Sequence, residues 1–221
     1  SNSGSWSTIL SRVVKRFTTA YHRRLLQERV DKCLVAKYSD DFSGLRTDYR
    51  LSESLTENYI DIFLPLIMFG VQSKSSSQRR RYITSLKTLC FVSPQKVLDT
   101  VLLDIYSSFD SVDSTHRINV ILREVTALAR YMVQLPVYRV HIPRLLSMLV
   151  PGIDSNDPEK TILTIGLVKL VSLVVPFADL TDGNGDGGTL AMDFTSQHIS
   201  YLEAKFYAGS PKSKTFLTVS Y

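Results

Sequence analysis

Oxygen-bearing side chains at alternating positions form the sharpest site-like pattern in the sequence. Asp182, Asn184 and Asp186 lie two residues apart in a glycine-rich tract, as in the first half of a calcium-binding loop. Asp193 falls at the twelfth position, where such loops normally use a bidentate Glu. Because Asp reaches less far and Pro176 interrupts the entering helix, the tract favours an acidic loop between helices. We therefore expect no metal ion and no cofactor.

Other residues with the spacing of catalytic motifs have simpler structural explanations. Ser93 and Lys96 match a Ser-x-x-Lys nucleophile, but no Ser-Asp-Asn or Lys-Thr-Gly motif follows them. Ser93 followed by Pro94 is instead typical of a helix start. The four histidines are scattered, and the sequence contains neither Cys-x-x-Cys nor a phosphate-binding glycine loop followed by lysine. The sequence predicts no catalytic centre, and hence no enzyme.

Positive charge is concentrated at the amino end of the chain. The formal net charge is +5, and the first fifty residues hold ten Lys or Arg against five Asp or Glu. The apolar stripe of the same helical segment comprises Ile9, Leu10, Val13, Phe17, Leu25, Leu26 and Val30. Without aromatic-basic interleaving, a solvated face that touches an acidic surface is favoured over a nucleic-acid reader. The candidate basic contact face comprises Arg12, Arg16, Arg23, Arg24, Arg79, Arg80 and Arg81.

The elements that position these residues are predicted to be helices. Apolar residues recur three and four apart and strand signals are nearly absent, which indicates an all-α protein. Helix pairs open at a capping box, Ser54 with Glu57, at Ser93-Pro94, and at Pro143. The intervals of 40 and 49 residues between these starts are close to the repeat of about 40–47 residues in HEAT and armadillo proteins. We predict an α-solenoid of HEAT/armadillo-like antiparallel helix pairs, with an irregular helical bundle as the alternative.

Three regions follow from this pattern. Residues 1–53 form a basic helical segment and loop, residues 54–180 form three helix pairs, and residues 181–221 form a Gly/Asp-rich loop, a short helix near 199–207 and a tail. The last paired helix restarts at Asp157-Pro158. Its expected inward side chains are Ile162, Ile165, Val168, Leu170, Val171 and Val174.

Two further expectations concern the environment of the chain. The longest apolar stretches, 60–71 and 162–178, each contain a charged residue and a proline, so we expect buried core helices and no membrane partner. Cys33 and Cys90 lie far apart within apolar helical patterns. They are expected to be buried thiols in a reducing compartment.

One segment also carries a family resemblance. The stretch 151–161, followed by an apolar helix and then by 176–179, resembles the amino-terminal part of the giant HEAT-repeat proteasome activators. The resemblance is specific over roughly 145–180. Pro151 and Gly152 form a turn in which Ile153 can serve as an anchor, and Asp157 with Pro158 caps the next helix. The signature residues are Pro151, Gly152, Asp154, Asn156, Asp157, Pro158 and Thr161.

The resemblance implies a function for the whole protein. Family members are very large monomeric solenoids that form a dome over the end of the core proteasome, contact its α-ring subunits and hold or open its gate without hydrolysing ATP. Such a chain would contact the rest of its own solenoid, in the nucleus and cytoplasm. The family's carboxyl-terminal hydrophobic-Tyr-any motif is not met by the final Val219-Ser220-Tyr221. No docking residue is carried over, and we expect an internal fragment.

Two alternatives remain at this stage. Paired helices alone are equally compatible with a karyopherin-like transport or scaffold solenoid that cradles an extended cargo. A metal-regulated switch using the tract from Asp182 to Asp193 ranks far below both.

Overall fold

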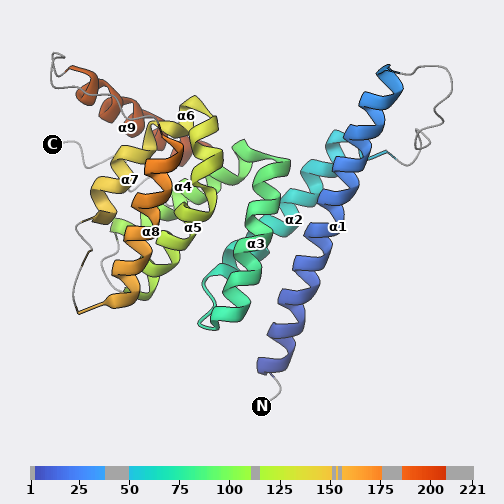
Figure 1. Cartoon of the computed structure of the whole chain (residues 1–221), viewed down its shortest axis with the longest axis horizontal. Helices are drawn as coiled ribbons and strands as arrows, with labels where there is room; N and C mark the ends of the chain where they lie inside the picture. Colours follow the sequence, from blue (N-terminus) through green and yellow to red (C-terminus); the bar gives the residue numbers. More distant parts are fainter. Residues whose placement is uncertain are drawn as a thin grey trace. The chain divides into compact units, whose positions relative to one another are not determined.

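A computed structural model of the chain describes residues 3–37, 50–110, 115–150, 153, 156–175 and 186–207 (Figure 1). All the regular secondary structure within these ranges is helical and none is strand, which confirms the all-α class. The chain divides into two compact units, 1–97 and 98–221. None of the described helices combines the length and the apolar character needed to cross a lipid bilayer.

The first unit contains three long helices, α1 (Ser3–Lys37), α2 (Glu53–Val71) and α3 (Ser76–Val92). Helix α3 packs against both α1 and α2, so the predicted pair of helices from the 54 and 78 regions is confirmed (Figure 1). Most side chains in the core of the first unit come from α2 and α3. The buried apolar residues are Val14, Ile60, Leu64, Ile67, Val71, Tyr82, Leu86, Leu89 and Cys90.

Helix α2 begins differently from the sequence prediction. Ser52 is its N-cap, and the Ser52 Oγ accepts a hydrogen bond of 3.2 Å from the Leu55 backbone N–H. The predicted capping box of Ser54 with Glu57 is therefore wrong. Both serines suit a cap by residue type, and the extended backbone at Ser52 decides between them. The helix continues through Pro65 to Val71.

Helix α1 packs against α3 through small and polar side chains. Ser11, Val14 and Thr18 are buried, and the Thr18 Oγ1 donates a hydrogen bond of 3.2 Å to the Ser85 Oγ of α3. Small side chains let two helices approach closely. The apolar stripe noted in the sequence is not on this face. Five of its members, Ile9, Val13, Phe17, Leu26 and Val30, are exposed, and the other two, Leu10 and Leu25, are half-buried.

The second unit is arranged around α5 (Thr115–Gln134), which contacts α6 (Pro136–Arg139), α7 (His141–Leu149) and α8 (Pro158–Val174). Helix α4 (Pro94–Asp110) begins at the predicted proline. The predicted inward side chains of α4 are buried, as are most of those of α5. The buried apolar residues of these two helices include Leu98, Val101, Leu102, Ile105, Ile121, Leu122, Val125, Leu128 and Met132.

Three predictions for the second unit are corrected. The helix expected to start at Pro143 begins at His141, after the unpredicted short helix α6. Helix α8, expected to pair with it, packs along α5. Helix α9 (Asp186–Tyr207) begins well before the predicted short helix near residue 199 and includes the end of the expected loop.

The inward face of α8 also differs from the prediction. Thr164, Leu167 and Val171 are buried, whereas Ile162 is 69% exposed and Ile165 is 54% exposed. Val168 lies at the surface as well. Apolar residues occur on every side of this helix, so their spacing could not identify the face that packs.

Candidate interaction surface

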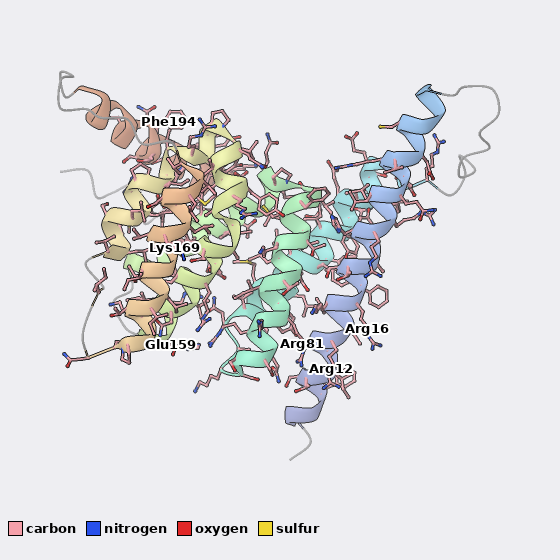
Figure 2. All side chains as sticks on the ribbon, viewed as in Figure 1. Arg12, Arg16, Arg81, Glu159, Lys169 and Phe194 are labelled. Atoms are coloured by element: carbon pink, nitrogen blue, oxygen red, sulfur yellow. The ribbon has the colours of Figure 1, made fainter. Side chains whose placement is uncertain are left out.

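A cavity of about 440 Å³ lies along α1 and α3 in the first unit. Figure 2 shows Arg12 and Arg16 on α1 together with Arg81 on α3. We call this cavity the basic groove, because five of its lining side chains are cationic. The groove is lined by Arg12, Lys15, Arg16, Thr19, Ala20, Arg23 and Arg81.

Helical spacing places these cations together. Arg12, Arg16 and Arg23 are separated by four and seven residues, and such positions share one face of an α-helix. Arg81 reaches the same cavity from α3, and its Nη1 donates a hydrogen bond of 3.2 Å to the Ser11 Oγ. The backbone path of two helices thus turns scattered sequence positions into one positively charged surface.

The charge of the groove is not neutralised within the part of the chain that the structure describes. Arg12, Lys15, Arg16 and Arg23 are exposed and form no ion pair there. Clustered cations around a concave surface concentrate positive potential and attract carboxylate groups. The arrangement can bind an acidic partner.

The other three residues of the predicted basic face lie outside the groove. Arg24 pairs with Glu28 on the same helix, with 2.7 Å between Nε and Oε1. Arg79 is buried and donates a hydrogen bond of 3.4 Å to the Ser73 carbonyl. Arg80 is exposed but does not line the cavity. The structure therefore gathers Arg12, Arg16, Arg23 and Arg81.

The candidate calcium tract falls largely outside the described residues. Asp182 and Asn184 are not described, Asp186 is the first residue of α9, and Asp193 is exposed on that helix. Among the described residues, no group of three or more His, Cys, Asp or Glu side chains is placed to hold a metal ion.

The family signature is described only in its second half. Pro151, Gly152 and Asp154 lie outside the described residues. Asp157 caps α8 as predicted, because its Oδ1 accepts a hydrogen bond of 3.0 Å from the Lys160 backbone N–H.

The remaining signature residues help to begin the same helix. Pro158 occupies the first turn of α8, and the Thr161 N–H bonds to the Asp157 carbonyl at 3.1 Å. Asn156 is exposed, and Ile153, expected as an anchor, is 49% exposed. This part of the signature positions a helix.

The residues with nucleophile-like spacing have structural roles. Lys96 forms an ion pair with Asp61 of α2, and the Ser93 carbonyl accepts a hydrogen bond from the Val97 N–H as α4 begins. Cys90 is buried as predicted, and burial raises the pKa of its thiol to about 12. The expectation that Cys33 is also buried is wrong, because Cys33 is exposed on α1.

Two histidines that the sequence showed as scattered meet in the second unit. The His141 Nε2 lies 2.9 Å from the His198 Nδ1, and the Tyr106 hydroxyl lies 3.1 Å from the His141 Nδ1. Burial is the main cause that lowers the pKa of His141, the nearby His198 and Arg144 add to the shift, and the resulting pKa is about 4. The chain of hydrogen bonds therefore joins neutral rings at neutral pH. The two histidines are 57 positions apart in the sequence, so no local sequence signal indicates this contact.

Helix α9 is also held by a carboxylate of α4. The Tyr138 hydroxyl donates a hydrogen bond of 2.6 Å to the Asp99 Oδ1, and the Lys205 Nζ donates one of 3.0 Å to the Oδ2. Asp99 is buried, so both of its oxygens are satisfied within the protein. This cluster fastens α9 to the second unit.

A buried carboxyl group lies within the core of the second unit. Glu124 on α5 is fully buried, and neither of its oxygens has a hydrogen-bond partner among the described residues. Burial is the main cause that raises the pKa of Glu124, Asp104 adds to the rise and Arg117 opposes it, and the resulting pKa is about 8. Arg117 itself pairs with Asp104 at 2.6 Å. Glu124 is therefore protonated at neutral pH.

A basic groove formed by packed antiparallel helices is typical of a helical-repeat protein that binds other proteins. Residues 1–219 match the family model for the mid HEAT repeats region of proteasome activator complex subunit 4. This chain belongs to the proteasome activator complex subunit 4 family. The family assignment agrees with the all-α architecture and identifies it as a HEAT-repeat α-solenoid. Resemblance placed the chain near the amino end of these proteins, whereas the matched model describes their middle region.

Individual relatives in the family are far longer than this chain. It is 30% identical to "Proteasome activator BLM10" of Saccharomyces cerevisiae over 98% of its own length, and it spans 10% of that protein. It is 25% identical to "Proteasome activator complex subunit 4" of Xenopus laevis and 24% identical to the human protein of the same name. Both of these matches cover 81% of the chain and 10% of the relative.

Proposed function

We propose that this chain is one region of an ATP-independent proteasome activator, a non-catalytic solenoid that binds the end of the core proteasome and influences gate opening and proteasome assembly. The match of residues 1–219 to the activator family supports this proposal and carries it. It also favours an activator over the transport or scaffold solenoid that paired helices alone left open. Contact would be made with the α-ring subunits, in the nucleus and cytoplasm.

The proposal is tested with the full-length protein that contains this chain. It should co-purify with core proteasomes, and those cores should hydrolyse small fluorogenic peptides faster than cores alone when no ATP is present. A full-length protein that neither associates with cores nor accelerates hydrolysis would contradict the proposal.

We further propose that the basic groove is a contact surface for an acidic protein segment. The four exposed cations on α1 have no ion pair within the described residues, and Arg81 completes the surface from α3. Ion pairs of this kind are screened by salt, so the contact should weaken as ionic strength rises.

Charge reversal distinguishes a contact surface from a merely solvated helix face. In the full-length protein, Arg12→Glu with Arg16→Glu should reduce the difference in stability, or in partner binding, between low and high salt. Arg12→Lys with Arg16→Lys keeps the charge and should retain that difference. Arg80→Glu with Lys87→Glu changes the same amount of charge on exposed positions of α3 outside the groove. An equal response from both reversed pairs would mean that the groove has no special role.

A further inference from the structure

An exposed apolar row runs along α1 directly beside the basic groove. Trp6 is 68% exposed, Ile9 46%, Val13 41% and Phe17 59%. Their spacing of three, four and four residues places them on one side of the helix, over about three turns. We call these four residues the apolar row. Side chains of this size are rarely left in water together unless another surface covers them.

The two borders of the apolar row differ in chemistry. On the side of α2, Phe17 contacts Phe63, with 6.3 Å between ring centroids. On the side of the groove, Arg12 follows Ile9 by three residues and Arg16 follows Val13 by three residues, so each cation lies beside an apolar member. A partner that binds this face would therefore need apolar side chains on its side nearest α2 and negative charge only on its side nearest α3.

The shape of the row favours a helix as the partner. Side chains three and four residues apart form the ridge into which a second helix packs, with the two axes about 8–10 Å apart. A membrane surface fits less well. A helix lying on a bilayer carries cations along its polar face towards lipid headgroups. Here Arg12 and Arg16 instead line a cavity to which Arg81 of α3 also contributes.

From these borders we propose that the apolar row and the basic groove together bind an amphipathic helix. This helix carries Asp or Glu along one edge only, and it belongs to the same polypeptide outside residues 1–221. This inference deepens the proposed role of the basic groove and does not depend on proteasome activation. Charge complementarity fixes the orientation of the helix: its acidic edge faces Arg12 and Arg16. The relatives are about ten times longer than the matched region, which leaves ample helical chain to supply it.

An occupant from the same polypeptide fits the degree of exposure. Apolar residues as exposed as Trp6 and Phe17 need lasting cover, and an intramolecular helix provides cover at every protein concentration. In a solenoid each helix pair buries its faces against neighbouring repeats. The buried side of α1 already contacts α3, which leaves the opposite side for such a neighbour.

Photo-cross-linking in the full-length protein tests the inference. Benzoylphenylalanine placed at Ile9 or at Val13 should cross-link within the same molecule to one helix outside residues 1–221, at positions three or four residues apart. The same probe at Lys87, exposed on α3, should not reach that helix. Cross-links to residues 98–221, to a second copy or to core proteasome subunits, or no cross-link at all, would overturn the proposal.

A charge swap tests the acidic edge. Arg12→Glu with Arg16→Glu should reduce the cross-link yield from Val13 at least several-fold, and changing the identified Asp or Glu residues to Lys in that variant should restore it. Circular dichroism establishes that each variant is folded. An unchanged yield would refute the acidic edge.

A labelling assay and a lipid assay add independent readouts. With Cys33 changed to Ser, Ile9→Cys in the full-length protein should react with a maleimide at least several-fold more slowly than Lys87→Cys in the same background, and equal rates would contradict a covered row. Binding to phosphatidylserine vesicles that is lost on Arg12→Glu with Arg16→Glu would show a membrane surface instead. If the full-length protein activates proteasomes but none of the expected cross-links form, only the docking inference fails.

Discussion

The two units differ in their most distinctive ionisable groups. In the first unit, the cations of the basic groove face solvent, and small polar residues join α1 to α3. In the second unit, Glu124 lies inside the core and His141 is buried against His198 of α9. Exposed charges respond to salt and to partners, whereas buried ionisable groups couple folding to pH. The first unit is thus built to present a surface, and the second responds to pH from within.

The largest effect is expected from the aliphatic core around α5. Leu122→Ala should lower the free energy of unfolding by about 2–5 kcal/mol, because Leu122 is fully buried and its loss leaves a cavity. Ile162→Ala on α8 is the control and should change it by about 0.5 kcal/mol or less, since Ile162 is 69% exposed. Urea denaturation measures both. Similar losses would show that the exposed face of α8 is packed.

Glu124 is expected to destabilise the second unit at alkaline pH. Its carboxyl has a pKa of about 8 when folded and an ordinary value of 4.5, so the folded state binds the extra proton between these values and stability falls as pH rises from about 4.5 to 8. Glu124→Gln should remove this fall in stability and raise the free energy of unfolding at pH 9 by on the order of 1–3 kcal/mol. The gain should vanish near pH 4.5. Urea denaturation across this pH range measures it, and a gain that is the same at every pH would contradict ionisation as the cause.

His141 should act in the opposite direction. Its pKa is about 4 in the folded chain against an ordinary 6.5, so the unfolded state binds the extra proton and stability is lost as pH falls from about 6.5 towards 4. His141→Phe should reduce this loss in the free energy of unfolding between pH 6.5 and 4 by on the order of 2 kcal/mol. Thermal unfolding between pH 4 and 7 provides the comparison.

Two glycines, one in each unit, should respond to alanine with opposite signs. A Cβ on Gly70 would lie 2.5 Å from three ring atoms of Tyr82, so Gly70→Ala should lower the free energy of unfolding by about 1–3 kcal/mol. A Cβ on Gly166 meets nothing within 4 Å, and Gly166→Ala should stabilise α8 by about 0.5–1 kcal/mol. Tyr82→Leu should relieve part of the Gly70→Ala loss. Two changes of the same sign in urea denaturation would refute the close contact.

The smallest expected difference concerns helix caps. Asp157→Ala should lower stability by about 1 kcal/mol, because its side chain caps the Lys160 N–H. Ser75→Ala at the start of α3 should have little effect, since Ser75 makes no side-chain cap hydrogen bond. Asp157→Asn should retain most of the stability that Asp157→Ala loses. Failure of Asn to restore it would indicate a role for the carboxylate charge.

Local signals could be read from the sequence, and long-range ones could not. The starts of α4 and α8 are encoded by a proline beside a capping residue, a signal contained within a few positions. Capping residues alone were ambiguous at α2, where Ser52 and Ser54 compete and the backbone conformation decides. The face that α1 buries was hidden, because the small partner Ser85 on α3 favours Thr18 over the larger apolar side chains.

The candidate site was predictable in part for the same reason. Arg12, Arg16 and Arg23 share a helix face by spacing, so their grouping follows from the sequence. Arg81 joins them only because α3 packs on α1, and Arg79 of the same triplet is buried. The contact of His141 with His198 depends on how α9 folds back, which no local pattern encodes.

The unequal placement of the two thiols makes α1 directly observable. Cys33 is exposed, whereas Cys90 is buried and its raised pKa of about 12 keeps it protonated. A maleimide dye added at neutral pH would therefore mark α1 at one position without any engineering of this region. Such a dye would report in real time on the helix that carries both the basic groove and the apolar row.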